Sequence, residues 1–256
     1  MSKVRVAFLG SKEIGAFCLQ HILHTQKELN VELVAVLSNN RTLQKGKQSI
    51  KQLAGDYKLP WYSHEDDLLQ LDFDLLISVQ YHAILKESHI QKAKSLACNL
   101  HMAPLPEYRG ANQFSFAIVD GSPLFGTTLH EMTPGIDAGG ILFENRFKID
   151  PNTETAISLY EKTNKASENL FVEHWADLVK GQYTAVSQAS FETARSSSFH
   201  LKSEIQSLKV VDLTQADEDI DRVVRACWFP PFDPPYALVN GEKKNLSLNW
   251  KEELGR

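Results

Sequence analysis

The stretch that decides the fold is Val4-Arg5-Val6-Ala7-Phe8-Leu9-Gly10, taken with the residues that follow it. Its apolar and β-branched side chains predict a buried strand, and its glycine marks a tight turn. A helical pattern then runs to Leu29, and a second β-branched run occupies Val31–Leu37. This order of strand, glycine turn, helix and strand predicts a parallel sheet with helices packed on it. The turn has two glycines where a dinucleotide fingerprint has three, so we interpret it as a tight turn.

The next residues extend this pattern. Residues 74–79 and 95–99 are continuous apolar runs, as expected for strands covered by helices on both faces. Residues 39–52 are polar and indicate a loop that enters a helix. The remaining periodic segments predict a short helix at 111–120, strands at 127–132 and 141–149, and a long amphipathic helix at 153–178 capped by Asn152 or Thr153.

The character of the sequence changes after Gly181. Residues 188–202 are rich in Ser and Thr without periodicity, and residues 213–227 include a short amphipathic helix. The segment 228–236 must be irregular, because its four prolines forbid helix and ladder. Ala237–Val239, the turn Asn240-Gly241 and the residues Leu246, Leu248 and Trp250 predict a closing β-hairpin, although charged residues offset the return strand. We therefore expect an α/β fold: a Rossmann-like, mostly parallel sheet flanked by helices, with a small C-terminal α+β extension ending in a β-hairpin.

The composition limits the classes of function. With 43% hydrophobic and 23% charged residues, the chain has the composition of an ordinary soluble globular protein. Its net charge of -5 argues against a surface built for long nucleic acids. The N-terminus predicts a strand and not a signal peptide, and no apolar run approaches the ~20 residues of a membrane span. Three dispersed cysteines, Cys18, Cys98 and Cys227, suggest free thiols and neither disulfides nor a metal site, so we expect a cytoplasmic protein.

Three polar residues could form a reactive site. Asn99 and His101 lie at and just past the carboxyl end of a predicted buried strand, the sheet edge where α/β proteins bind ligands. Their spacing of two places both side chains on one face if the strand continues. Such a pair can hold an acyl oxygen and donate to it as charge develops, while Asp137 orients the imidazole or assists proton transfer. Each residue alone is more often a cap or a satisfied polar group, and Gly135–Gly140 could be simply a tight loop.

A resemblance strengthens the first interpretation. The string Asn99–Gly110, with Gly126–His130 and Gly135–Gly139, resembles the signature of the folate-dependent formyltransferases. That family includes glycinamide ribonucleotide transformylase, methionyl-tRNA formyltransferase and the sugar N-formyltransferases. The resemblance covers roughly residues 1–180, which implies a catalytic domain there and an extension at 181–256 for acceptor binding or dimerisation.

The resemblance also implies roles for residues. Asn99 and His101 would hold the formyl oxygen and stabilise the tetrahedral intermediate, and Asp137 would assist proton transfer. The donor would be N10-formyltetrahydrofolate, with no metal, and the family often has a cis peptide at the place of Leu105-Pro106. The folate pocket maps onto Tyr81, His82, Ala83, Ile84 and Leu85, onto Met132 and onto the loop that carries Asp137.

Among the branches of this family, the sugar N-formyltransferases are the most similar. Residues 102–118, 78–82 and 225–232 resemble that branch, which implies a UDP- or dTDP-linked 4-amino-4,6-dideoxy sugar as acceptor, made for surface polysaccharide or flagellar glycan. The nucleotide would stack on aromatic side chains and pair its phosphates with cations. The expected acceptor contacts are His82, Met102, Tyr108, Arg109, Gln113, Lys202, Arg225, Trp228, Phe229 and Tyr236.

The sequence is compatible with other roles for these residues and with other acceptors. Trp228 and Phe229 could instead pack the extension onto the main core. Methionyl-tRNA or glycinamide ribonucleotide could be the acceptor, water could replace it in a formyltetrahydrofolate hydrolase, or the fold could serve a non-catalytic binder. We also expect a homodimer, formed by the hairpin or by residues 181–236, and no nucleic-acid or membrane partner.

Overall fold

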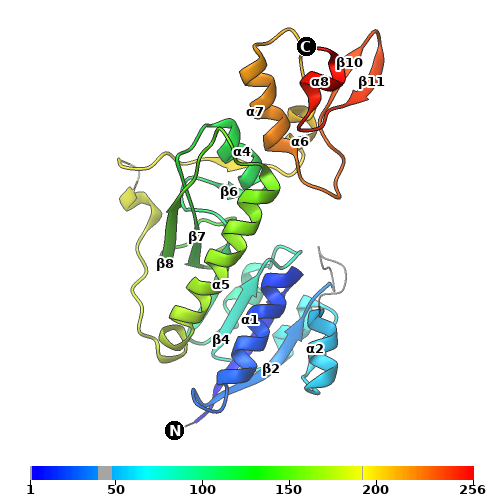
Figure 1. Ribbon diagram of the computed structural model, residues 1–256. Coiled ribbons are helices and arrows are strands. Elements are labelled where there is room, and N and C mark those ends of the chain that lie inside the picture. Colours follow the sequence, from blue (N-terminus) through cyan, green and yellow to red (C-terminus); the bar gives the residue numbers. More distant parts are fainter. Residues whose placement is uncertain (1, 40–47, 192) are drawn as a thin grey trace.

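The computed structural model describes residues 2–39, 48–191 and 193–256. Its centre is a seven-stranded sheet with the strand order β3-β2-β1-β4-β5-β7-β8 (Figure 1). The first five of these strands are parallel, and β7 runs antiparallel to both of its neighbours, so a mostly parallel sheet is confirmed. The strands are β1 (Val4–Gly10), β2 (Val31–Leu37), β3 (Trp61–Tyr62), β4 (Leu75–Val79), β5 (Leu96–His101), β7 (Leu124–Glu131) and β8 (Ile141–Lys148).

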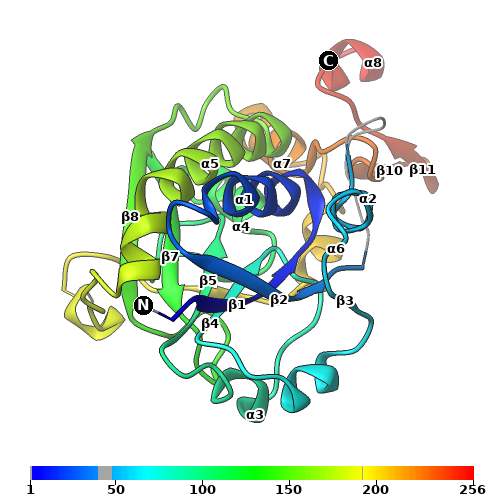
Figure 2. The ribbon, with the colours of Figure 1, turned by 90° about the horizontal axis from the view of Figure 1, so that it is seen from below.

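Helices cover the two faces of the sheet unequally. The helices α1 (Lys12–Thr25) and α5 (Ala156–Lys180) lie side by side over one face, with α2 (Ile50–Asp56) next to α1 (Figure 2). The short helices η1 (Glu65–Gln70) and α3 (Glu87–Ile90) lie on the other face. The α1/α5 face holds the larger apolar cluster, and the η1/α3 face holds a smaller one that stops short of the end of β5.

The long helix begins later than its sequence suggests. Thr155 is the N-cap of α5, where the sequence predicted Asn152 or Thr153. The Thr155 hydroxyl accepts the Ser158 N–H at 3.2 Å, and the Ser158 hydroxyl accepts the Thr155 N–H at 2.9 Å. This reciprocal pair satisfies two helix-terminal donors at once, which the earlier candidates do not do. Residues 40–47, most of the predicted polar loop, lie outside the described residues.

The residues after α5 form short helices and strands. The C-terminus lies at the opposite end of the molecule from the N-terminus (Figure 1). The predicted hairpin forms, but its return strand is charged rather than apolar. Because Asn240 and Gly241 adopt the positive φ angles of a two-residue turn, Val239 pairs directly with Glu242. The apolar residues predicted for that strand instead contribute Leu246 and Trp250 to a separate small core. The elements here are α6 (Glu204–Leu208), α7 (Asp217–Cys227), β10 (Tyr236–Val239), β11 (Glu242–Asn245) and α8 (Trp250–Leu254), and α7 packs on α4 (Gln113–Val119) of the preceding part.

Candidate active site

The site is built on the end of β5. This strand continues to His101, two residues beyond the apolar run, so Asn99 and His101 do share a face. Their neighbours Cys98, Leu100 and Met102 alternate with them and pack under α1 and α5. The polar pair therefore faces away from those helices, at the end of the sheet that η1 and α3 leave uncovered.

A second strand brings another histidine to this face. His130 in β7 is the direct antiparallel partner of Asn99, so the two side chains point the same way. The Asn99 amide nitrogen lies 3.2 Å from Nε2 of His130, and the rings of His130 and His101 stand edge to face with centroids 6.3 Å apart. His130 belongs to the quoted Gly126–His130 string, but the sequence alone does not give the register that aligns it with Asn99.

The loop that carries Asp137 completes the site formed by β5 and β7. The carboxylate reaches both imidazoles: Oδ2 lies 3.6 Å from Nδ1 of His101, and Oδ1 lies 3.5 Å from Nε2 of His130. Oδ2 also accepts the Gly110 N–H at 2.9 Å. Asp137 itself has a left-handed backbone with φ 49°, a conformation that costs a non-glycine residue ~1 kcal/mol or more. The three predicted catalytic residues are thus gathered in one place.

Hydrogen bonds to main-chain carbonyls fix which ring nitrogens carry protons. Nε2 of His101 lies 2.7 Å from the Tyr108 carbonyl oxygen, which can only accept, so Nε2 is the donor. For the same reason Nδ1 of His130 donates to the Glu131 carbonyl at 2.8 Å. The neutral His101 ring therefore presents a lone pair on Nδ1 to the site. Asn99 can then donate one amide hydrogen to His130 and keep the second for a bound oxygen.

The surroundings shift the ionisation of the central pair in a consistent way. Burial lowers the pKa of His101 below 6.5, although the Asp137 carboxylate acts against this. Burial acts to raise the pKa of Asp137, but His101, His130 and the Gly110 N–H outweigh it, and its pKa lies well below the usual range. At neutral pH the site thus holds a neutral His101 beside a carboxylate. A proton taken up at Nδ1 would produce an imidazolium that the carboxylate stabilises.

This arrangement suits carbonyl chemistry. Nδ1 of His101 can accept a proton from an attacking amine, and the resulting N–H can donate to an oxygen on which negative charge develops. The Asn99 amide supplies a second donor to the same oxygen. Acyl transfer to an amine needs these functions together, and the sequence predicted such a site from the same residues.

Two loops beside the trio carry the residues predicted to bind folate. One follows β4, where Ile84 is 75% exposed while Leu85 is buried under the sheet. The Tyr81 hydroxyl donates to Glu65 at 2.6 Å, and the Tyr81 ring packs edge-on against His82. Burial, together with this hydrogen bond, raises the pKa of the Tyr81 phenol. The other loop precedes β8 and carries Ile136, which is 42% exposed. The two exposed isoleucines give these loops apolar surfaces that fit a flat aromatic ring.

The predicted acceptor residues fall into two groups. Some side chains are occupied inside the protein: Met102 and Tyr108 are buried, and Phe229 packs on Tyr160 with ring centroids 5.4 Å apart. Arg225 is also buried, and its guanidinium donates to the Pro151 and Glu154 carbonyls and to Asp221. The others retain some surface, and they are His82, Arg109, Gln113, Lys202, Trp228 and Tyr236.

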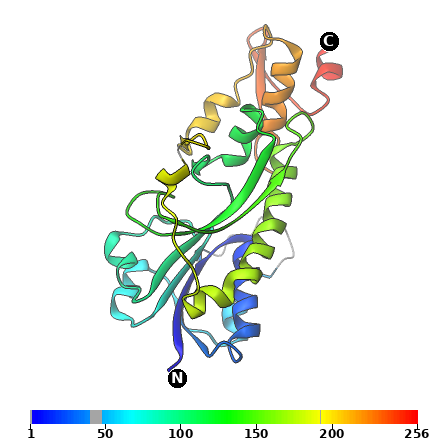
Figure 3. The ribbon, with the colours of Figure 1, turned by 90° about the vertical axis from the view of Figure 1, so that its left-hand side faces the viewer.

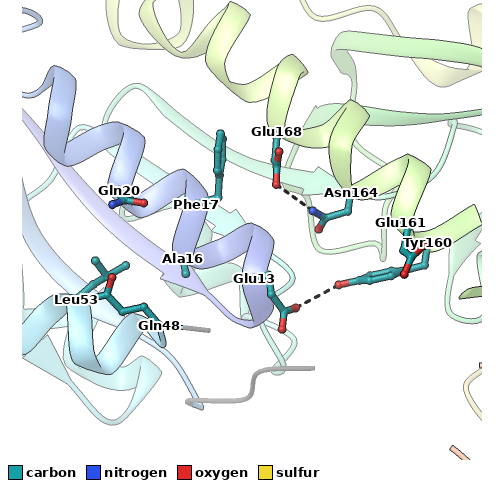
Figure 4. A pocket seen from close by; sticks show the side chains of 10 residues that line it. All are labelled: Glu13, Ala16, Phe17, Gln20, Gln48, Leu53, Tyr160, Glu161, Asn164 and Glu168. Atoms are coloured by element: carbon teal, nitrogen blue, oxygen red, sulfur yellow. Dashed lines mark hydrogen bonds between the residues drawn. The ribbon is translucent and has the colours of Figure 1, made fainter. Parts of the chain in front are cut away.

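A cavity of about 440 Å³ lies elsewhere, between α1 and α5 (Figure 4). Its lining includes Glu13, Glu161 and Glu168 together with Phe17 and Tyr160, and none of the catalytic trio. Because α1 and α5 cover the opposite face of the sheet, this cavity is separate from the candidate active site.

Comparisons with known proteins agree with this geometry. The sequence model described as formyl transferase matches residues 4–174. A GDP-perosamine N-formyltransferase of Brucella melitensis is 29% identical over 171 residues, 67% of this chain and 63% of that protein. A methionyl-tRNA formyltransferase of Listeria monocytogenes is 27% identical over 197 residues, 72% of this chain and 61% of that protein. This chain thus spans less than two thirds of these curated relatives.

One solved structure shows the extent of the shared fold. The N-formyltransferase of Helicobacter canadensis, in complex with folinic acid and dTDP-3-aminofucose, has a TM-score of 0.76 at 24% identity. The superposition covers 95% of this chain and 86% of that one, so the extension is included. Because the family model matches more than half of the chain, this protein belongs to the formyl transferase family. Leu105-Pro106 is cis, as that resemblance suggested.

Proposed function

We propose that this protein transfers a formyl group from N10-formyltetrahydrofolate to the primary amine of a nucleotide-linked 4-amino-4,6-dideoxy sugar. The observation that carries this proposal is the grouping of Asn99, His101 and Asp137 at the carboxyl end of β5, where the Asp137 carboxylate lies 3.6 Å from His101 and Asn99 contacts His130. The Brucella relative is named for a nucleotide-linked sugar, and the Helicobacter structure contains a folate and an amino-sugar nucleotide.

The chain's own residues can perform each step. When bound, the folate would supply an activated formyl group. The acceptor amine would attack the formyl carbon while Asn99 donates an amide hydrogen to the formyl oxygen. His101 would accept the amine proton at Nδ1, and that proton would pass to N10 of the folate as the bond between N10 and the formyl carbon breaks, which releases tetrahydrofolate. Asp137 stabilises the imidazolium during this exchange. Ile84 and Ile136 would flank the pterin ring, which leaves the face beyond His101 for the amine.

The acceptor's nucleotide would bind toward the extension, where Trp228 and Tyr236 are half-buried. Trp228→Ala should raise the acceptor KM several-fold with little change in kcat if its indole stacks on the base. Phe229→Ala is the matched control, because Phe229 packs on Tyr160 and its loss should lower Tm instead. An unchanged KM with a lowered Tm in Trp228→Ala would show that Trp228 also acts only in packing.

The acceptor is tested with a panel of amines. Purified protein, N10-formyltetrahydrofolate and UDP-, dTDP- or GDP-linked 4-amino-4,6-dideoxy sugars are combined, and release of tetrahydrofolate is followed. The GDP sugar is included because of the Brucella relative's name, and methionyl-tRNA because of the Listeria relative. Turnover with one sugar supports the proposal; turnover with methionyl-tRNA, glycinamide ribonucleotide or water alone replaces it.

We further propose a cytoplasmic homodimer whose product enters surface-glycan synthesis. Leu238 in the hairpin is 62% exposed and would be central to the interface. The free edge of β11 is unsuited to self-pairing, because antiparallel copies would bring Lys243 and Lys244 opposite each other. Leu238→Glu should therefore turn a dimer into a monomer in sedimentation equilibrium, and Leu248→Glu serves as control. Across the described residues, no helix has the length and apolar character needed to cross a membrane.

A further inference from the structure

The segment that follows α5 crosses the active site although its sequence has no regular pattern. It consists of residues 185–191 and 193–200, which we call the crossing segment, and it runs from the end of α5 past β8 and β7 toward α4 (Figure 3, in yellow). Val186 exchanges two main-chain hydrogen bonds of 2.8 Å with Ile141, the first residue of β8. This bridge places Gln188 next to the Asp137 loop.

Gln188 holds that loop with one amide group. Its Nε2 donates to the carbonyl oxygens of Asp137 and Gly139, both at 2.8 Å. Two acceptors at the same nitrogen fix the orientation of the amide. Both hydrogens of the amide nitrogen are therefore used on the backbone that carries the catalytic carboxylate.

The loop needs such external support. Asp137 has φ 49°, which an L-residue adopts only when its surroundings hold it there. Gly139 is pressed against β7, since a Cβ at that position would lie 1.9 Å from the Glu131 carbonyl oxygen. The loop is thus fixed against β7 on one side and by Gln188 on the other.

The crossing segment also makes contacts outside the Asp137 loop. Arg195 forms two hydrogen bonds with the Glu144 carboxylate, at 2.9 and 2.7 Å, and donates to the Leu105 carbonyl at 3.1 Å. Phe199 and His200 form a short strand, β9 (Phe199–His200), that pairs with β6 (Arg109–Gly110). Gly110 donates to the Asp137 carboxylate, so the crossing segment contacts both partners of that hydrogen bond.

We infer that Gln188 is a positioning residue for Asp137: its amide holds the loop so that the carboxylate stays between His101 and His130. This inference rests on the proposed function of the trio, but its geometry concerns the carboxylate and the two imidazoles alone. Gln188 touches the Asp137 main chain and acts on the reaction only through it. Methionine at this position would fill the same space without any donor.

The test compares Gln188→Met and Gln188→Glu with the same substitutions at Gln182, an exposed residue just after α5. Both Gln188 variants should lower kcat at least tenfold, with acceptor and folate KM within twofold, and the Gln182 variants should match wild type. A second readout is independent of turnover: the ring signals of His101 are titrated by NMR. Because the Asp137 carboxylate favours protonation of His101, Gln188→Met should lower the His101 pKa in the same direction as Asp137→Asn.

The outcomes separate the two claims. Inactive wild-type protein in which Gln188→Met still shifts His101 would overturn the proposed function and keep the positioning role. Active wild type with unchanged kcat and His101 titration in Gln188→Met would overturn the positioning role alone. A lowered Tm without those changes, or failure of both Gln188 variants to fold, would also contradict it, because the two hydrogen bonds would then support the fold and not the loop.

Discussion

Asp137→Asn is the substitution that isolates the charge in this site. Asparagine has nearly the shape of aspartate, and its Oδ1 can still accept the Gly110 N–H, which is 2.9 Å from the carboxylate in this structure. The negative charge beside His101 is lost, while the loop keeps its hydrogen bonds to Gln188. A decrease in kcat therefore measures the effect of the carboxylate charge on the imidazolium, because the loop itself stays in place.

The separation of the two groups sets the magnitude. Oδ2 of Asp137 lies 3.6 Å from Nδ1 of His101. With an effective dielectric constant of about 20, unit charges at this distance attract by about 4–5 kcal/mol. Before proton transfer His101 is neutral, so this attraction appears only as the reaction proceeds and acts on kcat. At 1.36 kcal/mol per factor of ten, its loss corresponds to a decrease of about a thousandfold.

The assay is steady-state formyl transfer at saturating folate and acceptor, with dissociation constants measured separately. Asp137→Asn should lower kcat by about three orders of magnitude and leave folate affinity within a few-fold. Circular dichroism and Tm confirm that the variant is folded. A kcat within tenfold of wild type would show that the carboxylate does not stabilise the charged imidazole.

Three further predictions follow from other parts of the structure. Because burial places the pKa of His101 below 6.5 and only the neutral ring can accept a proton, kcat/KM should rise with pH to a midpoint below 6.5 and then level off; a midpoint above 7 would contradict this. Gly139→Ala places a Cβ 1.9 Å from the Glu131 carbonyl, so it should abolish turnover and lower stability by ~1–3 kcal/mol in urea unfolding, and full activity would disprove the close packing. Thr155→Ala removes the α5 cap and should lower Tm by about 2–4 °C without changing kcat, whereas an unchanged Tm would show that the cap contributes nothing.

Most strands of the sheet could be predicted from the sequence, because burial on both faces produces continuous apolar runs that are recognised without knowledge of the tertiary structure. The runs at β4 and β5 are of this kind, and those at β1 and β2 depart from it at Arg5 and Glu32, near the start of each strand. The two-residue strand β3 has no comparable signal, since Trp61 and Tyr62 pair only with the end of β2. The return strand β11 was misplaced because pattern favours apolar residues, whereas the turn geometry at Asn240-Gly241 decides where pairing begins.

The part of the site that depends on spacing along the chain could be predicted from the sequence. Asn99 and His101 lie on one strand, so their alternation follows from the chain, whereas Asp137 was proposed as a distant carboxylate and gained its weight from the family resemblance. His130 depends on the register between β5 and β7, which is a long-range property that local pattern does not contain. Gln188 lies in a stretch without periodicity, and its contact with Asp137 exists only because Val186 bridges to Ile141. Functional contacts of this kind need the folded structure.

The proposed reaction of the group around His101 is the transfer of a formyl group from folate to an amino-sugar nucleotide. The most direct measurement follows the formyl carbon itself, with N10-[13C]formyltetrahydrofolate, one amino-sugar nucleotide and enzyme in a single-turnover experiment. We expect the label to appear as a 13C formamide on the sugar nitrogen, in an amount equal to the tetrahydrofolate released, and Asp137→Asn to delay it about a thousandfold. Label recovered as free formate, or tetrahydrofolate released without labelled sugar, would contradict the proposed reaction.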